Sequence, residues 1–494
     1  MPSILSLDEG TTGATALLVR DDGHVLGRGY REFTQHFPRP GWVEHDPLEI
    51  VRVSLHAMRE AVQQGGERPA ALGITNQRET VVLWDRATLE PVAPAIVWQD
   101  RRTTARCREL KEKGLEPFIR RATGLLADPY FSATKLEWML LDPAVRRRAE
   151  AGQLAFGTVE SWLVARLTGG LHVSDHTNAS RTMLYSLERR AWDDELLRLF
   201  TVPQRVLPEL VPSSGVVGEV RAEHLGFPLP IAGLAGDQQA ALFGQACTRR
   251  GQAKNTYGTG AFLLVHAGES PPTPGPGLLA TVACGPRGEP AYAVEGSVFI
   301  AGAAVQWLRD GLGLIASADE TQALAESVPD TGGVSFVPAF VGLGTPHWEP
   351  EARGTITGIT RGTTRAHLAR AAVEAMAFGT ADLLAAVQAG SGLEVPALRV
   401  DGGAAANDFL MQHQADVLGV PVERPAVLET TALGAAALAG MATGVWQGPD
   451  ELRAAEGVQR FAPGVGPAER RQRKAEWERA VGAALAWARW QPTP

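Results

Sequence analysis

The sequence predicts an α/β protein made of two similar halves with a cleft between them. Short apolar segments typical of strands alternate along the chain with longer helical segments, which favours layers of helices and sheet. A glycine- and threonine-rich turn lies between two apolar segments at residues 8–13, and a similar turn lies at residues 255–260. Two halves that begin with the same kind of hairpin indicate an internal duplication.

The first half opens with a strand-rich region and a clearly marked helix. A helix is expected from residue 47 to about residue 64, because Asp46 can cap it, Pro47 suits its first position and Glu49 can complete a capping box. Short apolar runs bounded by turn residues predict further strands. Those strands are expected at residues 3–7, 14–19, 24–29, 70–75, 81–84 and 231–235.

The second half is expected to begin just ahead of the second hairpin, which gives an N-terminal domain of residues 1–248 and a C-terminal domain of residues 249–494. A proline- and glycine-rich stretch at residues 271–277 is the alternative boundary, but it would separate the second hairpin from its own domain. Residues 432–445, mostly alanine and glycine, predict a tightly packed internal helix, and residues 462–494 predict one C-terminal helix.

The composition is that of a globular protein with a large core. Of its 494 residues, 45% are hydrophobic and 21% are charged. The net charge of −8 argues against nucleic acid or an anionic membrane as the main partner. Three cysteines without a CxxC pair suit a reducing compartment and argue against a disulfide framework or a structural zinc site. With no secretory signal pattern and no strongly apolar stretch of 18 residues, we expect a cytoplasmic protein without membrane insertion.

Two glycine-rich motifs are candidates for nucleotide binding. In the first turn, backbone N–H groups and the hydroxyls of Thr11 and Thr12 can bind phosphate, and Asp8 can hold Mg²⁺, usually through water. The alternative is an ordinary hairpin with a turn-stabilising aspartate. A strand that runs into Asp-Gly-Gly at residues 401–403 and then into a helix suits a phosphate or a purine, or is simply a tight turn.

Two polar motifs follow predicted strand ends, where ligand clefts open in α/β sheets. Asp237 is either a general base for a hydroxyl group or the N-cap of the next helix. Arg78 and Glu79 can bind neighbouring hydroxyls as donor and acceptor, or form an ordinary surface ion pair. Three aromatic residues near these motifs can serve as core or as a wall for a ligand, namely Trp98, Tyr130 and Phe262.

The order of the two hairpins and the strand–Asp-Gly-Gly–helix motif resembles the superfamily of sugar kinases, Hsp70 and actin. Longer segments resemble the FGGY family of carbohydrate kinases, and within it the members that phosphorylate glycerol. These segments are FPRPGWVEHDP at 37–47, GITNQRET at 73–80, DHTNASRTM at 175–183, AGDQQAALFG at 235–244, KNTYGTG at 254–260 and LRVDGG at 398–403. The resemblance extends over about residues 3–490. It implies two duplicated actin-like (ribonuclease H-like) ATPase domains with a catalytic cleft between them, and phosphorylation of glycerol by Mg-ATP to sn-glycerol 3-phosphate.

The resemblance also implies roles for individual residues. It implies a glycerol site, with Asp237 as the catalytic base, formed by Arg78, Glu79, Trp98, Tyr130, Asp237, Gln238 and Phe262. It implies contacts to ATP or ADP at Thr11, Thr12, Gly13, Thr15, Thr259, Gly302, Gln306, Gly403 and Asn407, with Mg²⁺ near Asp8. We also expect a homo-oligomer, either a dimer or a tetramer.

The chain departs from the family pattern in the first turn, where the usual DQGTTSSR reads DEGTTGAT. Glu9 is expected to add negative charge near the phosphates. Gly13 and Thr15 replace a serine and an arginine, so that an arginine contact to the nucleotide phosphates is lost and ADP is expected to bind more weakly. Two other functions stay open: a kinase for another polyol or sugar, and an actin- or Hsp70-like ATPase that needs no polyol site.

Overall fold

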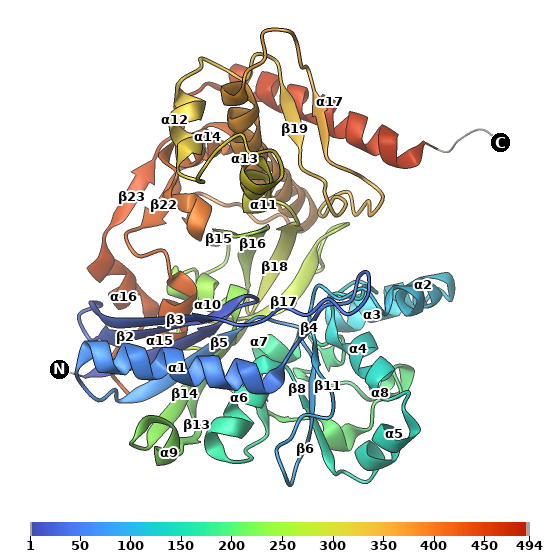
Figure 1. Cartoon of the computed structure of the whole chain (residues 1–494), viewed down its shortest axis with the longest axis vertical. Helices are drawn as coiled ribbons and strands as arrows, with labels where there is room; N and C mark the ends of the chain where they lie inside the picture. The colour runs from blue at the N-terminus through green and yellow to red at the C-terminus, as the bar shows by residue number, and fades with distance from the viewer. Residues whose placement is uncertain (1, 491–494) are drawn as a thin grey trace.

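A computed structural model describes residues 2–490 of the chain, without the side chains of residues 453–456. Its strands form two large mixed sheets, each covered by helices, and the two halves lie one above the other (Figure 1). The chain runs first through the lower half and then through the upper half, except that α15 (Thr430–Ala442) and α16 (Pro449–Glu456) lie beside the lower half.

The six-stranded sheet of the first half has the order β13-β14-β5-β1-β2-β3. Its strands are β1 (Ser3–Glu9), β2 (Gly13–Arg20), β3 (Val25–Glu32), β5 (Ala71–Asn76), β13 (Ser214–Val220) and β14 (Leu229–Gly236). The seven-stranded sheet of the second half has the order β17-β18-β16-β15-β21-β22-β23. Its strands are β15 (Ala253–Tyr257), β16 (Ala261–Gly268), β17 (Leu279–Cys284), β18 (Pro290–Val298), β21 (Leu398–Asp401), β22 (Val422–Pro425) and β23 (Val458–Phe461).

The two sheets share a central pattern. In the first, β3-β2-β1 are antiparallel and β1-β5-β14 are parallel. In the second, β18-β16-β15 are antiparallel and β15-β21-β22 are parallel. The predicted duplication of an α/β unit is therefore confirmed, and the two glycine- and threonine-rich turns join equivalent strands, β1 to β2 and β15 to β16.

Shorter strands form small pairs around the first sheet and beside the second. They are β4 (Glu44–His45) with β7 (Ala95–Ile96), β6 (Val82–Asp85) with β8 (Leu154–Gly157), β9 (Val173–Asp175) with β12 (Glu209–Val211), β10 (Tyr185–Ser186) with β11 (Ala191–Trp192), and β19 (Ser335–Val337) with β20 (Thr355–Thr357).

Helices cover the sheets and connect their strands. In the first half they are α1 (Pro47–Gly65), α2 (Thr104–Glu112), α3 (Glu116–Thr123), α4 (Ser132–Met139), α5 (Pro143–Glu150), α6 (Val159–Thr168), α7 (His176–Ala179), α8 (Asp194–Leu199), α9 (Ala222–Leu225) and α10 (Asp237–Gly244). In the second half they are α11 (Gly302–Gln306), α12 (Glu320–Glu326), α13 (Arg365–Ser391), α14 (Asp408–Leu418), α15 (Thr430–Ala442), α16 (Pro449–Glu456) and α17 (Pro467–Arg489). Single turns of 3₁₀ or π type lie at Gln204–Val206, Trp307–Gly311 and Gly403–Ala406.

The predicted helix after Asp46 is confirmed as α1. The Asp46 side chain accepts from the backbone N–H of Leu48, as an N-cap does. The predicted capping box does not form, because the Glu49 carboxylate accepts from the backbone N–H of Thr34, in the segment that follows β3. Glu49 thus makes this tertiary contact with Thr34 in place of the local capping-box contact with the backbone of Asp46.

The predicted internal helix is confirmed as α15, which comes from the C-terminal half of the sequence but packs on β5 and β14 of the first sheet (Figure 1). Small residues permit this approach: a Cβ atom at Gly73 of β5 would overlap the backbone of Ala435, and one at Gly233 of β14 would lie 2.7 Å from the backbone nitrogen of Ala439. The chain thus returns to the first half before it ends. The boundary near residue 248 stays a prediction.

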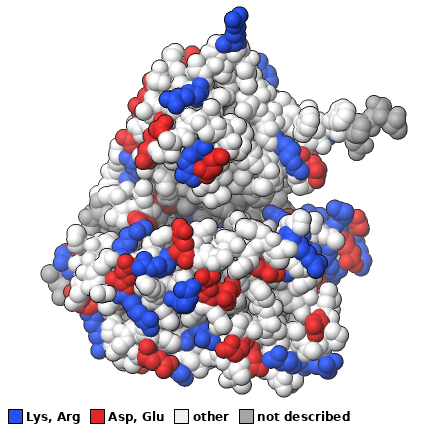
Figure 2. Space-filling view, in the orientation of Figure 1, with Lys and Arg blue, Asp and Glu red and all other residues white. Residues whose placement is uncertain are grey.

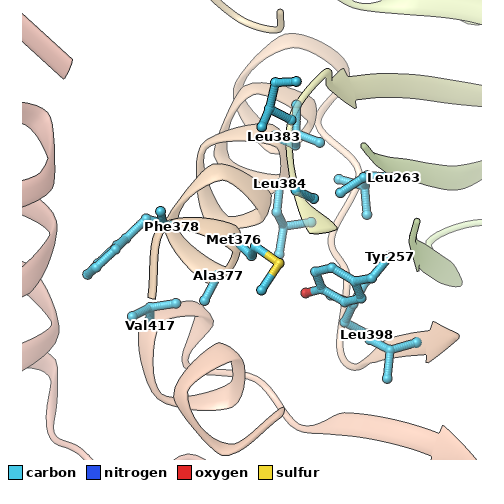
Figure 3. Close-up of a cluster of buried hydrophobic side chains, with 14 of the residues drawn as sticks. Tyr257, Leu263, Met376, Ala377, Phe378, Leu383, Leu384, Leu398 and Val417 are labelled. Carbon is cyan, nitrogen blue, oxygen red and sulfur yellow. The ribbon is translucent and has the colours of Figure 1, made fainter. Parts of the chain in front are cut away.

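The long helix α13 forms the centre of the second half. Among the described residues it is the one helix long and apolar enough to cross a membrane by length and composition, but 67% of its most apolar window is buried inside the protein. Met376 and Leu384 of α13 face Tyr257 and Leu263 of the second sheet (Figure 3). Such burial is typical of a core helix. The predicted C-terminal helix is α17, and residues 491–494 lie outside the described part.

Candidate active site

A tight turn after β5 carries the first two predicted site residues. Arg78 and Glu79 are only 2% and 1% exposed, so the surface ion-pair alternative is wrong. The backbone N–H of Thr80 donates to the carbonyl of Arg78 at 2.7 Å, and Glu79 between them has a φ of 62°. Ser132 Oγ donates to the Glu79 carbonyl at 3.0 Å and supports the turn. A left-handed glutamate at a strand end is a strained feature that is common at functional sites.

Two further charged residues surround this turn and form with it a buried charge quartet of Arg78, Glu79, Arg181 and Glu295. Arg78 donates to both carboxylate oxygens of Glu295, through Nη1 at 2.7 Å and Nη2 at 3.1 Å. Arg181 donates to Glu79 at 2.6 Å and to Glu295 at 3.0 Å. Since Glu295 lies on β18 of the second sheet, the charge quartet joins the two halves of the protein.

Burial and pairing compete at the two glutamates of the charge quartet. At Glu295, burial alone would raise the pKa, but Arg181 and Arg78 outweigh it and hold the pKa at about 2. At Glu79, burial is the stronger effect and raises the pKa above its ordinary value, although Arg181 and Arg78 oppose the shift. Glu295 is therefore the firm counter-ion of the two arginines.

Asp237 is the first residue of α10, and Gly236 occupies the N-cap position, so the predicted N-cap role does not hold. The backbone N–H of Gly236 donates to Thr177 Oγ1 at 2.9 Å, which fixes the entry to α10. Asp237 Oδ1 lies 3.1 Å from Arg78 Nε, and its side chain is 27% exposed. This carboxylate is oriented by Arg78 and remains open to a ligand.

Two further carboxyl groups, those of Asp8 and Glu9, lie near Asp237 at the end of β1. Burial, reinforced by the charge of Asp237, raises the pKa of Asp8 to about 8. Glu9 is fully buried and accepts from Gln77 Nε2 at 3.2 Å, and burial raises its pKa well above the ordinary value. Burial thus opposes the charged form of Glu9, and the expectation that Glu9 adds negative charge near the phosphates stays a prediction.

The described residues contain no cluster of three or more histidine, cysteine, aspartate or glutamate side chains that could hold a metal ion. This does not disagree with the predicted magnesium site at Asp8, because Mg²⁺ is commonly bound by one or two carboxylates together with water and phosphate oxygens.

Aromatic rings stand beside Arg78. The rings of Trp98 and Tyr130 meet edge to face with centroids 5.5 Å apart, and the Tyr130 hydroxyl lies 3.5 Å from Arg78 Nη2. Trp98 Nε1 donates to Thr11 Oγ1 at 2.9 Å, which connects this wall to the first glycine- and threonine-rich turn. The structure thus brings together Arg78, Trp98 and Tyr130, and it places Thr11 of the expected phosphate region beside them.

A fully buried lysine supports the loop that carries Tyr130. Lys135 Nζ donates to the carbonyl oxygens of Pro129, Tyr130 and Phe131 at 2.7–3.0 Å. Burial lowers the pKa of Lys135 to about 7. The three hydrogen bonds satisfy all the donors of the ammonium group and hold the loop in one conformation.

The second sheet turns a polar face toward the first half. Phe262 on β16 is half-buried and stands opposite Thr256 on β15 and Ser297 on β18. One row further along the same face lie Lys254 and Glu295, on either side of Leu264. Because directly paired residues share a sheet face, Phe262 lies on the side of the sheet that carries Glu295.

A cavity of about 400 Å³ lies in the second half, between the tip of the second hairpin, α11, α12 and the turn that precedes α14. Five predicted nucleotide contacts line it, namely Thr259, Gly302, Gln306, Gly403 and Asn407. Asn407 also caps α14, since its Oδ1 accepts from the N–H of Leu410 at 3.0 Å. The volume falls within the range of small-molecule sites.

Several lining residues of this cavity were not predicted. Met376 comes from the middle of α13, and Gln322 comes from α12, neither of which follows a glycine-rich turn. Gly402 has a φ of 84°, and a Cβ atom there would overlap the backbone of Tyr257, so this turn requires glycine.

The remaining predicted contacts lie on the first hairpin. Thr12 is exposed at its tip, and Thr15 is half-buried on β2 opposite Asp8. A Cβ atom at Gly13 would lie 2.6 Å from the carbonyl oxygen of Arg31, so a larger residue does not fit on this backbone. A groove runs between the two halves on the face shown in Figure 2.

Comparisons with known proteins point to one family. A model of the N-terminal domain of the FGGY family of carbohydrate kinases matches residues 3–244, and a model of its C-terminal domain matches residues 253–443. Glycerol kinase 2 of Thermotoga maritima is 53% identical over 493 residues, and the glycerol kinase of Aromatoleum aromaticum is 56% identical over 493 residues, in each case over 99% of both chains. A crystal structure of Plasmodium falciparum glycerol kinase with ADP has a TM-score of 0.91 at 35% identity and covers 98% of both chains.

Replacing Glu295 by alanine is expected to destabilise the protein, because Arg78 and Arg181 lose a buried counter-ion. Breaking such a pair costs about 3–5 kcal/mol, measured as the free energy of unfolding at neutral pH. The control is Glu478→Ala, because Glu478 is exposed. This substitution should change the free energy of unfolding by no more than about 0.5 kcal/mol.

The same variant has a defined pH dependence. Because the folded pKa of Glu295 is about 2, below its ordinary value of 4.5, its stabilising effect is complete above about pH 4.5 and is lost as the pH falls toward 2. The stability difference between parent and Glu295→Ala should therefore narrow through this window. Equal stabilities at neutral pH would contradict the role of Glu295.

Proposed function

Because the chain belongs to the FGGY family of carbohydrate kinases, we propose that it transfers the γ-phosphoryl group of ATP to glycerol and releases sn-glycerol 3-phosphate. Relatives that are named glycerol kinase and align with nearly the whole chain support this substrate. The observation that carries the proposal is the buried pair of Arg78 and Glu79 beside the partly exposed carboxylate of Asp237.

Arg78 and Glu79 form the polyol clamp. Arg78 can only donate hydrogen bonds, whereas a carboxyl oxygen of Glu79 can accept one, so together they match the hydroxyl groups of a polyol. Arg181 occupies Oε1 of Glu79, which leaves Oε2 for the substrate. The rings of Trp98, Tyr130 and Phe262 would face the carbon atoms of glycerol.

Asp237 is the proposed general base. Its carboxylate is held by Arg78 Nε at 3.1 Å and is 27% exposed, so that it can reach a hydroxyl group of the bound polyol. It would accept the hydroxyl proton as the oxygen attacks the γ-phosphorus atom. Closure of the two halves would keep water out and prevent ATP hydrolysis.

The nucleotide would bind across both halves. Thr11, Thr12, Gly13 and Thr15 of the first hairpin would face the phosphates together with Thr259, and the cavity that contains Gly302, Gln306, Gly403 and Asn407 would take the nucleoside. Thr15 replaces the arginine of relatives, so ADP would bind with one phosphate contact fewer.

The residues at the end of β1 fit a magnesium ion. Burial and the neighbouring Asp237 disfavour the charged form of Asp8, and a divalent cation would offset both effects. Asp8 would therefore hold Mg²⁺, in part through water, and the bound ion would neutralise phosphate charge. We further propose that the enzyme is cytoplasmic and forms a homo-oligomer, a dimer or a tetramer.

An ADP-release assay with and without glycerol tests the proposed function. ADP should form with Mg-ATP and glycerol and stay near the background without a polyol, since the clamp must be filled for transfer. Faster ADP release with another polyol or sugar would indicate that the protein is a kinase for that compound instead. Release that does not depend on any polyol would favour an actin- or Hsp70-like ATPase and contradict the proposal.

Asp237→Asn should lower kcat for glycerol by about 10²–10⁴-fold, because asparagine keeps the shape but cannot accept a proton as a carboxylate does. Thermal unfolding and nucleotide binding should remain close to the parent. Asp142→Asn is a matched control, because Asp142 caps α5 and asparagine caps equally well. A folded Asp237→Asn variant that keeps more than about a tenth of the parent rate would remove Asp237 from the role of base.

A further inference from the structure

Lys254, on β15 of the second sheet, is a buried cation that the catalytic scheme does not use. Its side chain is fully buried. Lys254 Nζ donates to Oε1 of Gln238 and to Oγ1 of Thr256, the latter at 2.7 Å. Gln238 belongs to α10 and directly follows Asp237. A lysine of the second half therefore contacts the helix that carries the proposed base.

The surroundings of Lys254 favour an ammonium group at neutral pH. Burial lowers its pKa, but only to about 8, because Asp401, Asp237 and Glu295 favour the charged form against the opposing effect of Arg78. Its hydrogen-bond partners in the described residues are the two uncharged oxygens rather than any of these carboxylates. The position of the ammonium is thus set by direct contact with Gln238 and Thr256.

The contact determines which way the Gln238 amide faces. An ammonium group donates and cannot accept, so the amide atom next to it must be the carbonyl oxygen. The amide nitrogen of Gln238 then lies on the other side. In the part of the chain that the structure describes, this Nε2 has no protein partner, and Gln238 is 7% exposed. Its two N–H groups are left for a ligand.

We propose that Lys254 is a positioning residue that fixes the side-chain amide of Gln238, with its oxygen held inside and its N–H groups turned toward the polyol. The inference rests on the proposed function. An N–H group of Gln238 would donate to the oxygen of a substrate hydroxyl whose proton is accepted by Asp237. Without Lys254 the amide could rotate and present an oxygen that repels the hydroxyl oxygen.

Steady-state kinetics of a double-mutant cycle test the proposal, with KM measured for glycerol and for ATP. Lys254→Met should raise the glycerol KM by about 10-fold, the effect of losing one hydrogen bond to a buried polar site. The ATP KM should change less than about twofold. In a Gln238→Ala background, Lys254→Met should have almost no further effect on the glycerol KM, because it acts through Gln238.

The other fully buried lysine provides a matched control. Lys135→Met also removes a buried ammonium, but its partners are the carbonyls of residues 129–131. Its effect on the glycerol KM should be the same with and without Gln238→Ala. If Lys254→Met has equal effects in both backgrounds, or no effect in either, the proposed role of Lys254 is wrong.

If Lys254→Met does not fold, the variant Gln238→Glu provides a second test of the proposal. Gln238→Glu keeps an oxygen for Lys254 but has no N–H group for the polyol, so the glycerol KM should rise as much as in Gln238→Ala. A parent-like KM in Gln238→Glu would overturn the proposal. These outcomes differ from failure of the proposed function, in which the parent protein itself shows no glycerol-dependent ADP release.

Discussion

The charge quartet of Arg78, Glu79, Arg181 and Glu295 is the constraint on which the site depends. Two arginines and two glutamates lie almost entirely out of water, and each is stabilised only while its partners stay in place. Buried ion pairs add little net stability compared with apolar residues, but breaking one is costly. The charge quartet therefore restricts how the two sheets can meet, and it orients both residues of the polyol clamp.

The rest of the site lies around the charge quartet, where segments of the two halves pack against each other. α10 begins at Asp237 and packs on α15, which fits against the first sheet through glycines such as Gly73. The base, the clamp and Asp8 all lie at the ends of neighbouring parallel strands, β14, β5 and β1, where ligand sites of α/β sheets open. Lys254 and Glu295 reach the same place from the second sheet.

The sequence predicted the family, the duplicated fold and the elements whose signals are local. The comparisons confirm the resemblance to FGGY carbohydrate kinases, and the cap of α1 and the position of Arg78 at a strand end follow from neighbouring residues. Glu295 could not be found in this way. It lies inside a strand, without a turn signal, and meets Arg78 across 217 residues of sequence. The burial of Glu9, which raises its pKa, could not be read from the motif either.

Glycerol binding to Glu295→Gln, measured by titration calorimetry beside ADP binding, tests most directly whether the charge quartet holds the polyol clamp. Glutamine fills the same space but no longer balances the two arginines. If the charge quartet holds the clamp, glycerol affinity should fall by about 10-fold or more, the loss expected when a buried charge is left unpaired, while ADP affinity should stay within about twofold. An unchanged glycerol affinity in the folded variant would contradict it.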